Sequence, residues 1–247
     1  MIDSKALIHA TLDAGREFFR APHGFGNSPE DAELPEDTLA TAKPAPAVVP
    51  IRLLSARHRE RITQHLLALN EHDRYLRFGY TASEEQIRRY TDGLDFARDE
   101  IYGIYNRKLE LIAMAHLALA SEPDCSNCAE FGVSVLAPAR GKGYGAHLFE
   151  RAIMHSRNKG VDMLFIHVLS ENNVMLKIAR NAGALVERDG SESRAFLKLP
   201  PATIDTCMTE AVQEQFAEMD FTLKLQAKRF WQFLASVQKV RTGAQEH

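Results

Sequence analysis

The residues Arg140-Gly141-Lys142-Gly143-Tyr144-Gly145 separate a predicted strand from a predicted helix. The alternating glycines let the backbone turn sharply and approach a ligand closely. A helix that begins directly after such a loop offers unpaired N–H groups and the positive end of its dipole to a phosphate. The stretch therefore predicts a phosphate-binding turn, in which Arg140 and Lys142 add positive charge. A tight strand-to-helix turn without a ligand is the alternative interpretation.

Two common phosphate-binding motifs do not fit this loop. A Walker A loop ends in Gly-Lys-Ser/Thr, whereas Lys142 is followed by Gly143. A dinucleotide fingerprint has the spacing G-x-G-x-x-G, and here the third glycine, Gly145, comes one place early. The loop therefore argues against a P-loop NTPase and against a dinucleotide-binding domain.

The pattern on both sides of the loop predicts a mixed α/β domain over residues 48–199. Apolar runs of five to eleven residues alternate with segments of helical periodicity. The predicted strands cover 48–54, 100–105, 109–119, 129–136 and 161–169, with a closing hairpin at 184–188 and 194–199. The predicted helices cover 57–69, a segment that starts at Ser83, 145–159 and 172–181.

Two flanking segments complete the predicted domain organisation. Residues 1–47 begin with a helix that Asp3 or Ser4 caps, and continue as a proline-rich linker. Residues 200–247 form a long amphipathic helix, or two, after Pro200-Pro201. The apolar face of this helix requires a partner, which is either the N-terminal helix or a second subunit in a homodimer.

Composition limits the class of protein. The 247 residues carry a net charge of −3, and 45% of them are hydrophobic, so a folded core is expected. The charge balance argues against nucleic-acid binding driven by bulk charge. No apolar run approaches the ~18 residues of a membrane span. Three cysteines and a start without a signal-peptide pattern predict a cytoplasmic protein.

Residues 130–184 resemble the acetyl-CoA-binding core of the GNAT superfamily of N-acetyltransferases. The resemblance includes a strand at 130–135, the glycine loop, a strand at 163–168 and the segment 171–183. Ala129-Glu130-Phe131 and Tyr75-Leu76-Arg77-Phe78 are also similar to the acetyltransferase domains of bacterial protein-lysine acetyltransferases.

This resemblance implies an α/β (α+β) GNAT fold, with a mostly antiparallel mixed sheet, two splayed parallel central strands and flanking helices. It implies acetyl-CoA as the acyl donor and a primary amine as the acceptor, either a protein lysine or a small molecule. A non-catalytic, regulatory acyl-CoA-binding module is the alternative from a different functional class.

The resemblance also implies the site residues. Glu130 is the general base that takes a proton from the amine, although a strand-end acid on the surface is the simpler interpretation of that residue alone. No metal is implied. The residues implied in acetyl-CoA binding are Val133, Ser134, Val135, Arg140, Gly141, Lys142, Gly143, Tyr144, Gly145 and Asn172.

One position departs from the family pattern, and two other signals stay open. Many GNAT enzymes have a tyrosine acid seven residues after the asparagine, where this chain has Ala179. Cys125 and Cys128 form a C-x-x-C that is either two loop thiols or a redox pair, because no second ligand pair for zinc accompanies it. His116 and His167 are predicted to lie in the core or in a cleft.

Overall fold

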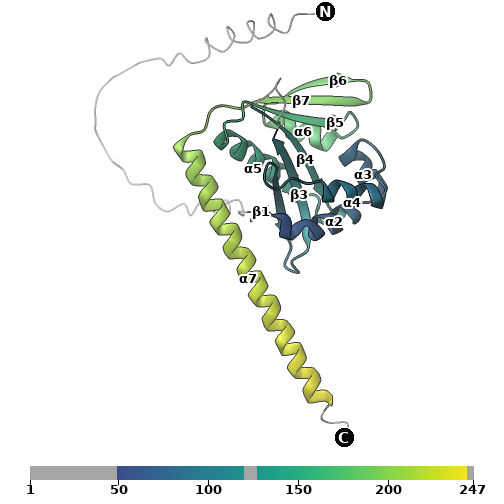
Figure 1. Cartoon of the computed structure of the whole chain (residues 1–247), viewed down its shortest axis with the longest axis vertical. Coiled ribbons are helices and arrows are strands. Elements are labelled where there is room, and N and C mark those ends of the chain that lie inside the picture. Colours follow the sequence, from purple (N-terminus) through teal and green to yellow (C-terminus); the bar gives the residue numbers. More distant parts are fainter. Residues whose placement is uncertain (1–48, 120–126, 244–247) are drawn as a thin grey trace, which may run out of the picture. The chain divides into compact units, whose positions relative to one another are not determined.

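A seven-stranded mixed sheet forms the centre of the structure (Figure 1). The computed structural model describes residues 49–119 and 127–243, with side chains as far as residue 235. In chain order the strands are β1 (Arg52–Leu54), β2 (Glu100–Tyr105), β3 (Leu111–Leu119), β4 (Cys128–Val135), β5 (Met163–Leu169), β6 (Leu185–Asp189) and β7 (Glu192–Lys198). Their order across the sheet is β1-β2-β3-β4-β5-β7-β6. Neighbours are antiparallel except β4 and β5, which run parallel.

Helices cover both faces of the sheet (Figure 1). Met114 packs in a core cluster with Ile62 and other residues of α2 and α4. Its neighbour Ala115 points the other way, into a cluster that contains Leu148 of α5 and Leu176 of α6. The helices are α2 (Arg59–Leu67), α3 (Glu71–Phe78) and α4 (Glu84–Asp92) on one face, and α5 (Tyr144–Asn158) and α6 (Asn173–Asn181) on the other; two short 3-10 turns are η1 (Ala56–His58) and η2 (Ala137–Ala139).

The parallel strands β4 and β5 diverge along their length. They pair only over three positions, and the last pair joins Glu130 to Phe165. On its other side, β4 stays paired with β3 as far as Val135. Among the described residues, therefore, no strand pairs with β4 from Phe131 to Val135 on the side that faces β5. The predicted splay is confirmed, and it leaves backbone hydrogen-bonding groups of β4 open to a ligand.

The C-terminal helix α7 (Ile204–Gly243) is continuous and packs on the domain. Glu210 on α7 lies 2.7 Å from Nδ1 of His155, whose Nε2 lies 3.2 Å from Glu100. Burial lowers the pKa of His155, but hydrogen bonds to the two glutamates outweigh this effect and raise the pKa. Farther along α7, Glu218 forms an ion pair with Arg52 of β1. The division into residues 1–47, 48–199 and 200–247 remains a prediction.

Most predicted elements are confirmed within two residues at each end. Two differ: the first strand is shorter and begins at Arg52, and residues 71–78, for which no helix was predicted, form α3. The sequence did contain the end signals of α3, because Asn70 caps its first turn and Gly79 ends it with a φ of 80°. The predicted N-terminal helix and nearly all of the linker lie outside the described residues.

A buried histidine ties α2 to the sheet. Nδ1 of His65 lies 2.8 Å from the carbonyl oxygen of Leu111, and Nε2 lies 2.8 Å from Oγ of Ser134. The carbonyl only accepts, so Nδ1–H donates to it, and the Ser134 hydroxyl donates to Nε2. Burial lowers the pKa of His65 to about 4. The ring is therefore neutral in the folded protein at every pH above that value.

This histidine predicts acid-dependent stability. Between pH 6.5 and 4 the unfolded chain protonates His65 whereas the folded protein does not, so the free energy of unfolding decreases as the pH falls. The difference in pKa corresponds to about 3 kcal/mol. We expect the His65→Gln variant to lose most of this dependence, about 2.4 kcal/mol between pH 7 and 4.5, in urea unfolding at pH 7, 5.5 and 4.5. The exposed His72 provides the control: His72→Gln should keep the wild-type dependence, and equal curves for all three proteins would contradict the prediction.

Candidate active site

A pocket of about 430 Å³ lies where β4 and β5 diverge. One side of it comes from the end of α3, and the floor comes from β4 and β5. Its lining consists of residues 76–80, 130–133 and 166–169, together with Asn172, Met175, Glu192 and Ser193. The three parts of the lining lie far apart in the sequence, so only the fold assembles this pocket.

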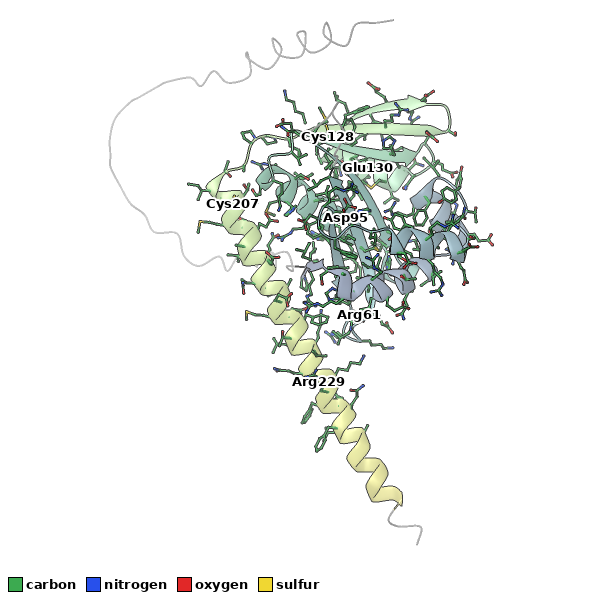
Figure 2. All side chains as sticks on the ribbon, in the orientation of Figure 1. Arg61, Asp95, Cys128, Glu130, Cys207 and Arg229 are labelled. Atoms are coloured by element: carbon green, nitrogen blue, oxygen red, sulfur yellow. The ribbon has the colours of Figure 1, made fainter. Side chains whose placement is uncertain are left out.

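Glu130, the predicted general base, lines the pocket at the last paired position of β4. Figure 2 shows Cys128 and Glu130 along the first part of this strand. The Glu130 side chain is exposed, although a general base is often partly buried. Side chains alternate along a strand, so Glu130, Gly132 and Ser134 all face α2, α3 and α4. The carboxylate is thus open to the pocket and to solvent water.

The glycine loop has the geometry that an anion-binding turn requires. Gly141 and Gly143 both have a φ of 75°, a conformation that residues with a Cβ rarely adopt. Gly143 is the N-cap of α5 and contributes no side-chain hydrogen bond, so the first N–H groups of the helix stay available. A Cβ on Gly145 would lie 3.4 Å from Ile178 on α6, so this glycine allows close packing of the two helices.

The basic residues of the loop differ in their surroundings. Arg140 forms an ion pair with the buried Asp73 of α3, and its Nε donates to the carbonyl of Val135 over 3.3 Å. Its guanidinium is therefore held beside the loop, with part of its charge already balanced. Lys142 is exposed in the turn, and Tyr144 begins α5 half-buried.

The predicted acetyl-CoA-binding residues of β4 divide into two groups. Val133 lines the pocket, and Val135 follows it on the open edge of the strand. The side chain of Ser134 instead points to α2, is buried and binds His65, so only its backbone is available to a ligand. Asn172 lines the pocket and caps α6, where its Oδ1 accepts from the N–H of Met175.

Residues 66–184 match the model of the acetyltransferase (GNAT) family, and this range contains the splayed strands, the pocket and the loop. These residues are a GNAT acetyltransferase domain. Enzymes of this family transfer an acetyl group from acetyl-CoA to an amine, and residues 66–184 accordingly form a domain of the GNAT acyltransferase type.

Solved structures share the fold of the GNAT domain. The GNAT domain of S. lividans PAT is 22% identical with a TM-score of 0.53, and the match covers 63% of this chain and 96% of that one. A GNAT-family acetyltransferase from Staphylococcus aureus Mu50 is 11% identical with a TM-score of 0.51, covering 62% and 99%. One from Streptococcus pneumoniae is 10% identical with a TM-score of 0.50, covering 61% and 98%. No curated protein matches the chain in sequence.

Position 179, where many GNAT enzymes have a tyrosine acid, is an alanine in this domain. Ala179 is fully buried in the core cluster, where the small side chain fits between helix and sheet. His167 is the pocket-lining residue that the sequence analysis placed in the core or a cleft, and its side chain is exposed there. His116 is mostly buried and lies opposite Gly132 on the neighbouring strand.

Arg77 lines the pocket, and the sequence indicated it only as a member of the segment Tyr75-Leu76-Arg77-Phe78. A signal for it did exist: a glycine inside a strand, here Gly132, often marks a site where another group approaches the backbone closely.

Three further predictions concern the cysteine pair, metal binding and membrane spans. Cys125 lies outside the described residues, so the redox interpretation of the Cys125–Cys128 pair remains a prediction. In the part of the chain that the structure describes, no group of three or more His, Cys, Asp or Glu residues could hold a metal ion. No helix among residues 49–119 and 127–243 is long and apolar enough to cross a membrane.

Proposed function

We propose that this protein transfers acetyl from acetyl-CoA to a primary amine by direct attack, with Glu130 as the general base. The observation that carries the proposal is the shared pocket, which places the Glu130 carboxylate beside the open edge of β4. A primary amine has a pKa near ~10.4 and is mostly protonated at pH 7, so a base raises the fraction that can react. We place the reaction in the cytoplasm, because three cysteines in 247 residues are too few for a disulfide framework.

The proposed reaction has two chemical stages. Glu130 takes one proton from the ammonium group, directly or through a water, and the free nitrogen attacks the thioester carbonyl carbon. A backbone N–H near Val135 stabilises the oxyanion that forms. The C–S bond then breaks, coenzyme A leaves as a thiolate, and the nitrogen loses its second proton to water, which leaves a neutral amide. With a pKa near ~8.5, the thiol needs little help, so water suffices as the acid where Ala179 stands.

Acetyl-CoA is proposed to bind along the open edge of β4 and at the start of α5. The backbones of Val133, Ser134 and Val135 pair with the pantetheine amides. The N–H groups of residues 141–145 hold the pyrophosphate, and Lys142 adds positive charge. Arg140 supports the loop from its ion pair with Asp73. Asn172 uses its amide nitrogen, since its oxygen already caps α6.

The acceptor that we propose is a lysine side chain of a protein. The segment Tyr75-Leu76-Arg77-Phe78 forms the end of α3 and its last three residues line the pocket. The similarity in fold to the GNAT domain of S. lividans PAT also supports a protein lysine as the acceptor. A small-molecule amine is the alternative acceptor, and a non-catalytic acyl-CoA-binding module is the alternative function.

One assay separates these three alternatives. The full chain is incubated with acetyl-CoA and either lysine peptides, Nα-acetyl-lysine or polyamines, and the release of free coenzyme A thiol is followed. We expect release with lysine acceptors well above the rate of hydrolysis. Turnover with polyamines alone would indicate a small-amine enzyme. Binding of acetyl-CoA without turnover on any acceptor would indicate the module and overturn the proposed function.

We also propose that the exposed face of α7 pairs with the same helix of a second copy. Val212, Phe216, Met219, Leu223 and Phe230 are separated by four, three, four and seven residues, and each is 43–68% exposed. This is the spacing of a two-stranded coiled coil. The opposite face of α7 is already occupied, since Ala217 is buried and Glu218 binds Arg52.

An identical helix suits this face better than an unrelated apolar segment. Gln226 occupies the heptad position between Leu223 and Phe230. In a pair of identical helices the two Gln226 side chains meet, so each amide finds a hydrogen-bond partner in the other. The flanking positions nearest to this face carry one acid, Asp220, and one base, Arg229, so identical parallel helices place no like charges opposite each other. The labelled Arg229 marks this part of α7 in Figure 2.

The pairing predicts a dimer that one substitution dissociates. Light scattering of the wild-type chain should give twice its mass of 27.7 kDa. Leu223→Glu places a charge in the apolar layer and should give single chains at micromolar concentration, because burying an unpaired carboxylate is costly. Gln232→Glu adds the same charge away from this face and should leave the dimer intact. A wild-type mass of one chain, or an unchanged mass for Leu223→Glu, would contradict the pairing.

A further inference from the structure

A chain of hydrogen bonds runs behind the pocket from Arg77 to Asp99. Nη2 of Arg77 lies 3.0 Å from the hydroxyl of Tyr90, and this hydroxyl lies 2.7 Å from Nδ1 of His116. Nε2 of His116 then lies 3.0 Å from Oδ2 of Asp99. The four residues come from α3, α4, β3 and the segment before β2. Tertiary packing alone brings them together.

Hydrogen-bonding chemistry fixes the direction of every bond in this chain. The Asp99 carboxylate only accepts, so Nε2–H of His116 donates to it. Burial lowers the pKa of His116, so the ring is neutral at pH 7 and its Nδ1 accepts from the Tyr90 hydroxyl. The oxygen of Tyr90 in turn accepts from Nη2–H of Arg77. Arg98 binds the other oxygen of Asp99 over 2.9 Å, which holds the far end of the chain.

The chain holds the Arg77 guanidinium flat against β4. A Cβ built on Gly132 would lie 2.7–2.8 Å from Cζ, Nη1 and Nη2 of Arg77. Three atoms of the group at nearly one distance mean that its plane lies face-on over this glycine. Any side chain at position 132 would displace it. The strand therefore has a glycine where the guanidinium needs the space.

Arg77 lines the pocket with its charge uncompensated by a carboxylate. Among the ion pairs that the described residues form, none includes Arg77. Its hydrogen bond to Tyr90 uses one N–H out of the five that a guanidinium has. The residue is half-buried, so solvent screens its charge only in part. An anionic group of a ligand would be attracted to this position.

Arg77 also stands next to the proposed base. Glu130 and Gly132 are two residues apart on the same face of β4, a separation of roughly 7 Å along the strand. A molecule in the pocket thus meets a carboxylate at one position and a guanidinium at the next. This pair of charges matches an acceptor that carries an amine and a carboxylate, and it repels one with a second positive charge.

We propose that Arg77, held by Tyr90, His116 and Asp99, binds a carboxylate of the acceptor while Glu130 faces the reacting amine. The planar fork of a guanidinium matches a carboxylate through two parallel hydrogen bonds. In a protein acceptor the carboxylate belongs to an acidic residue beside the lysine; in a small acceptor it is part of the same molecule. This inference rests on the proposed function and specifies its substrate class.

Matched acceptors test the inference. Nα-acetyl-lysine carries a carboxylate, and its C-terminal amide presents the same reacting amine without the charge. Two peptides repeat the comparison for a protein-like acceptor: one contains Lys-Glu, which supplies the carboxylate, and the other contains Lys-Gln, which lacks it. With the wild-type protein we expect kcat/KM to favour the acidic member by about tenfold, mainly through KM. A preference for the acidic member in the small pair alone identifies a small molecule as the acceptor. A preference for the acidic peptide alone identifies a protein as the acceptor.

Variants of Arg77 decide whether the guanidinium is responsible. Arg77→Met should abolish the preference for the acidic acceptor, and Arg77→Lys should keep part of it because the charge remains. An unchanged preference in Arg77→Met would overturn the inference, as would an equal loss on acidic and amide acceptors. If the wild-type protein turns over none of these acceptors, the proposed function itself is overturned. The failure of the inference and the failure of the proposed function are therefore distinguishable.

Tyr90→Phe tests the positioning role of the chain. The ring still packs against Phe78, so the variant should fold, but the oxygen that holds Arg77 is lost. We expect a several-fold smaller preference for the acidic acceptor with little change on the amide acceptor. Tyr105→Phe, at a buried tyrosine that packs against Phe221, should change neither value. An equal decrease on both acceptors in Tyr90→Phe would indicate a merely structural residue.

Discussion

Replacing Glu130 with glutamine is expected to lower kcat by about 10²- to 10⁴-fold, the usual contribution of a general base. Glutamine keeps the size of the side chain and loses the group that takes the proton. The binding of acetyl-CoA, measured by calorimetry, should change little, because Glu130 lies at the paired start of β4 and the open edge follows it.

The control for this prediction is Glu187→Gln on β6. Glu187 is an exposed strand glutamate outside the pocket, so the substitution changes the net charge equally and should leave kcat unchanged. A wild-type kcat in Glu130→Gln would reject Glu130 as the base. In that case His167→Gln becomes the informative variant, since His167 is the exposed histidine that lines the same pocket.

Substituting Gly143 with alanine should weaken acetyl-CoA binding by about 10- to 100-fold. A Cβ at a φ of 75° is strained by about 1–2 kcal/mol, so the backbone of the loop must shift. The shift turns the first N–H groups of α5 away from the pyrophosphate. Losing one charge-assisted hydrogen bond costs about 1.5–3 kcal/mol, which corresponds to this change in affinity.

Gly160 offers a matched control for the Gly143 substitution. It follows the other end of α5, also has a φ of 75°, and has open space where a Cβ would be added. Gly160→Ala should therefore destabilise the fold by a similar amount, measured by urea unfolding, without changing the KM for acetyl-CoA. Equal effects of both substitutions on KM would show that the loop acts only through stability, and would contradict a phosphate-binding role.

Local signals in the sequence located the elements that carry the predicted cofactor site. The helix start at Ser83, the apolar run of β5 and the turn at residues 140–145 each depend on neighbouring residues, and the structure has all three elements at the predicted places. The splay of β4 and β5 was expected from the resemblance, since strand pairing across a sheet is a long-range property that local periodicity does not encode.

The acceptor side of the pocket was harder to predict. α3 is short and mostly polar, so its helical pattern was weak even though Asn70 and Gly79 marked its ends. Arg77 belongs to the segment Tyr75-Leu76-Arg77-Phe78, but nothing local in the sequence gives its side chain a different role from the exposed arginines of the same region. What separates it from them is its contact with Gly132 and Tyr90, which lie 55 and 13 positions away.

The sequence by itself determined the strands and helices along residues 49–243 apart from α3, the turn at residues 140–145 and the position of Glu130 near the start of its strand. These follow from short-range rules: glycine conformations, apolar periodicity and helix caps. Only the tertiary structure decided that α7 packs on α5 and β1, that Ser134 is engaged with His65, and that Arg77 reaches the pocket. The physical reason is that buried polar groups find their partners across elements that only the folded core brings together.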